Sequence, residues 1–64
     1  MPERAILREH FASILAAARS AAEAYARLAS AERDPQRRAE LQRLARDGQR
    51  HVELSERLLE IVRE

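Results

Sequence analysis

Residues that form turns are almost absent from this chain, and this shortage constrains its fold more than any other feature. The 64 residues include one Gly and two Pro. Ala, Leu and charged residues dominate, a composition typical of long helices. One interior break remains, at residues 30–35, where Asp34 can cap free backbone N–H groups and Pro35 suits the first position of a helix. The sequence therefore predicts a single hairpin over residues 1–64, with helices at about 3–31 and about 35–63.

Both predicted helices carry apolar residues at helical spacing, and strict alternation, which would indicate strands, is absent. The first stripe consists of Leu7, Phe11, Ile14, Ala18, Ala21, Tyr25 and Leu28, flanked by Leu15, Ala22 and Ala29. The second consists of Leu41, Leu44, Ala45, Gly48, His51, Val52, Ser55, Leu58, Leu59 and Val62, widened by Leu54 and Ile61. The short connection makes the helices antiparallel neighbours, so the expected fold class is all-α.

Two helices alone leave much of each apolar stripe in water. Ordering the chain costs about 1.5 kcal/mol per residue, and chains below about 70–80 residues usually need a disulfide, a metal or an oligomer. The chain contains no Cys, which excludes disulfides and thiolate zinc sites. We therefore expect a homo-oligomer, with two hairpins joined by a two-fold axis into a four-helix bundle as the leading arrangement.

Charge and composition exclude several classes of function. The net charge is +1, and the acidic residues interleave with twelve basic ones that are all Arg. With few aromatic residues and no basic cluster, no nucleic-acid partner is expected. No stretch approaches about 18 uncharged apolar residues, so no membrane association is expected either. The charged N-terminus does not resemble a signal peptide, and together with the lack of Cys this favours a cytoplasmic location.

The centre of the second stripe is unusually polar. Gly48, His51 and Ser55 lie near its midline, and Asp47 lies at its edge. Asp47 and His51 stand four residues apart, on one face of a helix, where they could chelate a metal ion, so they are the candidate metal ligands. Three alternatives stay open. His51 could be a histidine at the edge of the core that bonds Tyr25 or Ser55, Gly48 could serve only close helix packing, or the helix could break at Gly48.

Residues 25–29, the Asp34-Pro35 corner and residues 41–54 together resemble the helical hairpin of the ferritin-like superfamily, of the rubrerythrin and encapsulated-ferritin type. The resemblance implies a four-helix bundle, iron as cofactor and a protein shell as a possible partner. Members of the superfamily carry a Glu seven residues before the Tyr, and a Glu three residues before the His. Here these positions hold Ala18 and Gly48, so that only Tyr25 and His51 match.

The resemblance therefore implies the fold of the family without its usual di-iron chemistry. The leading hypothesis is a non-catalytic structural or partner-binding protein of the ferritin-like group, with a degenerate di-iron site and no cofactor. A divergent iron-binding ferroxidase or iron-storage protein that uses His51 and Asp47 is one alternative. A dimerisation module unrelated to ferritins is the other.

Overall fold

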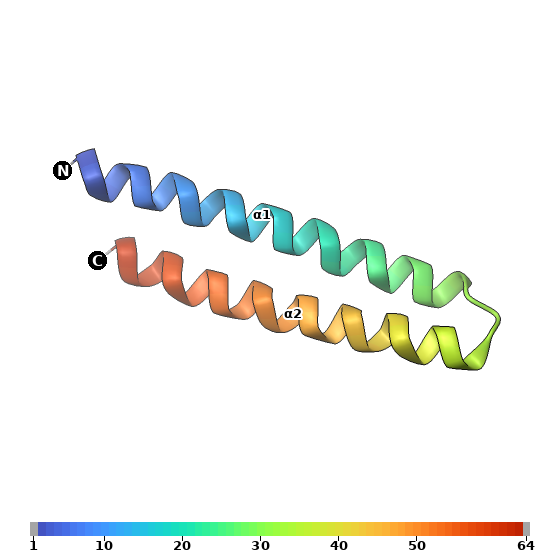
Figure 1. The fold of residues 1–64 in the computed structure, drawn as a ribbon. Helices are drawn as coiled ribbons and strands as arrows, with labels where there is room; N and C mark the ends of the chain where they lie inside the picture. The colour runs from blue at the N-terminus through green and yellow to red at the C-terminus, as the bar shows by residue number, and fades with distance from the viewer. Residues whose placement is uncertain (1, 64) are drawn as a thin grey trace.

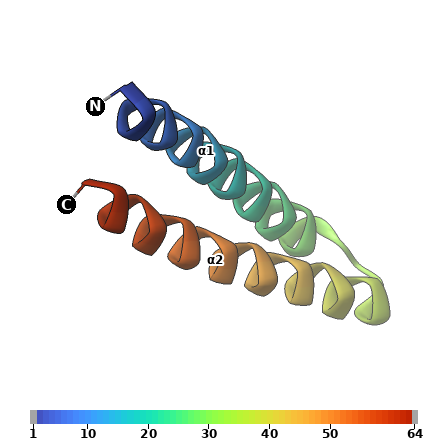
Figure 2. The same cartoon turned by 60° about the vertical axis from the view of Figure 1, so that its left-hand side comes forward.

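The protein folds into two long α-helices joined by one sharp corner (Figure 1). The structure is a computed structural model and describes residues 2–63. Helix α1 spans Pro2–Ala31 and helix α2 spans Pro35–Arg63. The helices run antiparallel side by side, so both ends of the chain lie at the end opposite the corner (Figures 1 and 2). The Cα trace extends over 51 × 13 × 10 Å. The prediction of an all-α helical hairpin is confirmed.

The corner is built as its residue types indicate. The Asp34 carboxylate accepts a hydrogen bond from the backbone N–H of Arg37 at 3.0 Å. The Asp34 carbonyl accepts the first bond of α2, from the N–H of Arg38, at 2.9 Å. Pro35 is the first residue of the helix, where its missing N–H costs nothing. Asp34 is therefore the N-cap of α2.

A second set of contacts at the corner, made by Arg38, has no local signal in the sequence. The Arg38 guanidinium donates to the carbonyl of Glu32 at 3.0 Å and to the carbonyl of Arg33 at 3.2 Å. The Glu32 carboxylate in turn accepts from the N–H of Asp34 at 3.1 Å. Arg38 thus satisfies carbonyl groups that follow the end of α1 and holds both helices to one turn geometry.

The two helices meet along a line of residues spaced alternately three and four apart, the spacing of a coiled coil. We call this line the seam. It consists of Phe11, Leu15, Ala18, Ala22, Tyr25 and Ala29 on α1, and of Leu41, Ala45, Gly48, Val52, Ser55, Leu59 and Val62 on α2, all of them buried or half-buried. The most enclosed of the described side chains are Ser55 and Val52, which are 3% and 4% exposed. Even these two retain some contact with water.

The centre of the stripe on α1 differs from the sequence-based prediction. Leu15, Ala22 and Ala29, expected beside the stripe, are buried, whereas Leu7, Ile14 and Leu28, expected within it, are exposed. One neighbouring helix covers only a narrow line of positions. With Ala at two of the buried positions, the helices can approach closely, which places the bulkier aliphatic residues outside the contact.

Gly48 lies within a continuous helix, so the predicted alternative of a break at this position is wrong. Its φ is in the ordinary helical region. A Cβ placed on Gly48 would lie 3.1 Å from the Cβ of Ala22 and 3.2 Å from its Cα. These distances are shorter than a relaxed contact between carbon atoms. The lack of a side chain at Gly48 therefore serves close packing of α2 against α1.

Candidate functional site

The two candidate metal ligands, Asp47 and His51, are both exposed on α2. They line one shallow hollow, together with Arg50 and Leu54 of the same helix. Their spacing places the carboxylate and the imidazole one helical turn apart, as the sequence suggests. The Arg50 guanidinium beside them adds a positive charge, which opposes the binding of a cation.

The polar centre predicted for α2 is divided between two environments. Gly48 and Ser55 lie on the seam, and Ser55 is buried, but His51 lies outside it. The expectation that all three lie near the midline of the buried face is therefore wrong for His51 within one hairpin. Tyr25 is half-buried at the seam, nearer the corner than His51. Among residues 2–63, no cluster of three or more His, Cys, Asp or Glu side chains could hold a metal ion.

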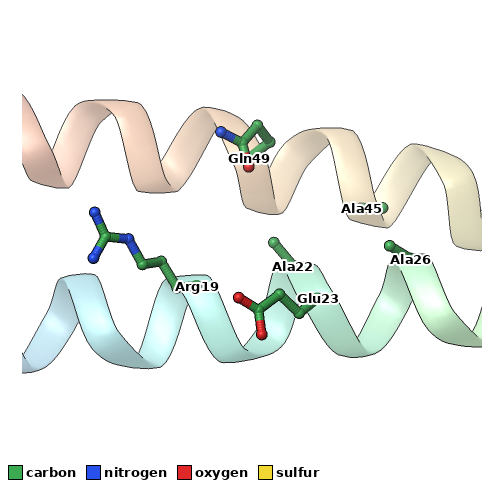
Figure 3. A pocket seen from close by; sticks show the side chains of 6 residues that line it. All are labelled: Arg19, Ala22, Glu23, Ala26, Ala45 and Gln49. Atoms are coloured by element: carbon green, nitrogen blue, oxygen red, sulfur yellow. The ribbon is translucent and has the colours of Figure 1, made fainter.

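A second hollow, which the sequence did not indicate, crosses from one helix to the other. It is lined by Arg19, Ala22, Glu23, Ala26, Ala45 and Gln49. Figure 3 shows the methyl groups of Ala22 and Ala26 on the side of α1 that faces α2, with Glu23 and Arg19 beside them and Gln49 on the opposite helix. The hollow exists because small seam residues leave space between longer polar neighbours.

The same side of the hairpin carries an ion pair between the helices. The Arg19 guanidinium donates to the Glu56 carboxylate at 3.3 Å. Both side chains are about half exposed, so the pair contributes little stability, on the order of 0–1 kcal/mol. Arg19 directly follows the seam residue Ala18, and Glu56 directly follows the seam residue Ser55. The pair therefore shows that the residues following the seam on α1 and on α2 lie on the same side of the hairpin.

The opposite side of the hairpin carries large apolar side chains together with the exposed Asp47 and His51. It carries residues that directly precede a seam residue in the sequence, or that lie one helical turn before a seam residue. We call this side the open face; its large side chains are Leu7, Ile14 and Leu28 on α1, and Leu44, Leu54, Leu58 and Ile61 on α2. They are between 37% and 60% exposed, and among residues 2–63 they include every exposed large hydrophobic except Ile6. His51 lies among the α2 members of this face, between Leu44 and Leu58 at seven-residue spacing.

No known protein family, curated protein or solved structure matches the chain. Among residues 2–63, neither helix contains a run that is long and apolar enough to cross a membrane.

Proposed function

We propose that this chain is a non-catalytic structural protein whose hairpins pair through the open face into a four-helix bundle. The observation that carries this proposal is the open face itself. Scattered apolar residues on a surface are ordinary, but seven large apolar side chains on one side of two packed helices favour a site of interaction. A second copy fits it, because two identical apolar faces related by a two-fold axis complement each other.

The accessible surface area of the hairpin also supports pairing with a second copy of the chain. The chain exposes 5270 Å² of accessible surface. A compact folded monomer of 7.4 kDa exposes about 4,200 Å² by the usual scaling with mass. The excess of about 1,000 Å² is close to the roughly 800 Å² that each partner contributes to an interface of standard size.

The seam gives independent support, because its two flanks are covered unequally. Leu15 and Leu59, beside the Arg19–Glu56 pair, are buried. Phe11 and Tyr25, each three residues from a member of the open face, are only half-buried. A second layer of helices on the open face would enclose the free flank of these aromatic rings, which bury large apolar areas.

The relation to the ferritin-like superfamily is part of this proposal. It rests on the helical hairpin and on the places of Tyr25 and His51 within it. Ala18 and Gly48, which stand where the family carries Glu, both lie on the seam and supply no ligand. The bundle would therefore keep the architecture without the di-iron centre, and a protein shell as a partner rests on the resemblance alone.

Sedimentation equilibrium at micromolar concentration tests the proposed function. The wild-type chain should sediment at twice its mass of 7.4 kDa. Ile14→Glu places a carboxylate in the open face and should give a monomer. Ala16→Glu adds the same charge to an exposed position away from this face, and should leave the dimer intact. A cooperatively folded wild-type monomer at this concentration would overturn the proposal.

A metal-binding function is the second candidate, because Asp47 and His51 line the same hollow. Titration with ferrous iron under argon, followed by measurement of bound metal and of the oxidation rate in air, tests it. This function requires stoichiometric binding that His51→Ala abolishes and that His10→Ala, which removes the other histidine, leaves unchanged. Wild-type protein that takes up no metal would contradict it.

A further inference from the structure

The open face is uneven along its length, and this unevenness constrains how two copies can meet. Ala22 and Gly48 lie at the same level along the hairpin, since a Cβ on Gly48 would be 3.1 Å from that of Ala22. Counting away from this pair at about 1.5 Å per residue places the other members. Near the corner the face holds Leu28 and Leu44; in the middle it holds Ala17, Ala21, Ala24, Asp47, His51 and Leu54; near the chain ends it holds Leu7, Ile14, Leu58 and Ile61.

The charged residues at the edges of the face also differ between the helices. On α1, Arg27 borders the corner half of the face. On α2, Arg43 lies at the level of Arg27, and Glu40 and Asp47 lie one turn to either side of that level. If equal levels of the two copies meet, Arg27 of one copy faces Arg43 of the other as well as the two carboxylates, so these edge charges favour neither arrangement of the copies.

We propose that the two copies pair with their corners at the same end, so that α1 of each lies against α2 of the other. This inference rests on the proposed function and specifies its interface. Leu28 then meets Leu44 of the second copy, and the large apolar side chains near the chain ends of the two copies meet each other.

The reversed pairing, with corners at opposite ends, is less favourable. It sets α1 against α1 and α2 against α2. It also sets the bulky Ile14 of α1 near the alanines of the other α1, which removes the matching of large residues with large ones.

Disulfide cross-linking distinguishes the two pairings, because the chain has no Cys of its own. Ala17 and Leu54 lie at nearly the same level, close to the middle of the hairpin, and both are exposed. In the proposed pairing Ala17 faces Leu54 of the second copy. In the reversed pairing Ala17 faces Ala17, and Leu54 faces Leu54.

The experiment mixes Ala17→Cys and Leu54→Cys chains, unfolds and refolds them together, and oxidises them. Mass spectrometry of the covalent dimers should show the mixed species and little of either self-linked species. Glu53→Cys, adjacent in sequence but on the opposite side of α2, should cross-link with neither variant.

Each other outcome overturns the inference in a distinguishable way. Self-linked dimers of each variant would establish the reversed pairing and leave the proposed function standing. A dimer in sedimentation that gives no cross-link in any mixture would place the interface away from the open face. A wild-type monomer would refute the proposed function and this inference together.

Discussion

Replacing Gly48 by Ala has two opposing effects on stability, one through helix propensity and one through packing. In an isolated helix, replacing Gly by Ala stabilises by about 1 kcal/mol. In the hairpin, the added methyl group would lie 3.2 Å from the Cα of Ala22, and backbone atoms cannot move away as a flexible side chain can. The helices would have to separate locally by a few tenths of an ångström, and such overpacking typically costs about 1–3 kcal/mol.

We therefore expect Gly48→Ala to lower the midpoint of thermal unfolding, measured by circular dichroism at 222 nm. The double variant Gly48→Ala with Ala22→Gly transfers the methyl group to the other helix. It should be less destabilised than the sum of the two single variants. A higher midpoint for Gly48→Ala would show that helix propensity outweighs the close contact.

Asp34 offers a simpler test, because its role is local. Asp34→Ala removes the hydrogen bond from the N–H of Arg37 to the Asp34 carboxylate. Loss of an N-cap should lower the free energy of unfolding by about 1 kcal/mol, measured by urea denaturation. Asp34→Asn keeps an acceptor oxygen at this position and should retain most of the stability. A wild-type value for Asp34→Ala would contradict the capping role.

These residues also show why some local features could be predicted and others could not. Asp34 and Pro35 act on the first turn of their own helix, so the residue types suffice to indicate the corner. Arg38 binds carbonyl groups five and six residues earlier, across the corner. This contact depends on the turn angle of the chain, which no residue type specifies, so it could not be predicted from the sequence.

At the scale of the helices, periodicity identified two amphipathic rods but not which part of each stripe would be covered. In α1 both Ile14 and Leu15 suit an apolar stripe, and only the position of α2 decides that Leu15 is buried while Ile14 is exposed. The same uncertainty placed His51 in the interior of the hairpin. A wide stripe with two adjacent faces is what a four-helix bundle requires, because each helix there contacts two neighbours.

This division predicts different consequences for two adjacent residues. Leu15→Ala removes a buried side chain from the seam and should reduce the free energy of unfolding by about 2–3 kcal/mol. Ile14→Ala should act mainly on dimer association, since Ile14 is 38% exposed in the hairpin. Sedimentation equilibrium and urea denaturation of both variants separate the two effects. Equal losses in both measurements for both residues would contradict the distinction between the seam and the open face.

For the whole molecule, the proposed dimer makes stability depend on concentration. Association that favours the folded state raises the unfolding midpoint as the protein concentration rises. We expect the thermal midpoint to increase measurably between 5 and about 500 µM chain, in calorimetry at both extremes. Ile14→Glu should show a midpoint that is low and independent of concentration. A constant midpoint for the wild-type chain would indicate that the hairpin is stable alone.

The corner has a consequence for how the molecule acquires its shape. Every contact between α1 and α2 lies on a path that starts at the three residues between them, so pairs close to the corner enclose the shortest loops and lose the least chain entropy when they form. Folding should therefore begin with contacts near the corner, between Ala29 and Leu41, and proceed toward the chain ends. Amide hydrogen exchange should then be slowest beside the corner and fastest around Phe11 and Val62, whose contacts form last.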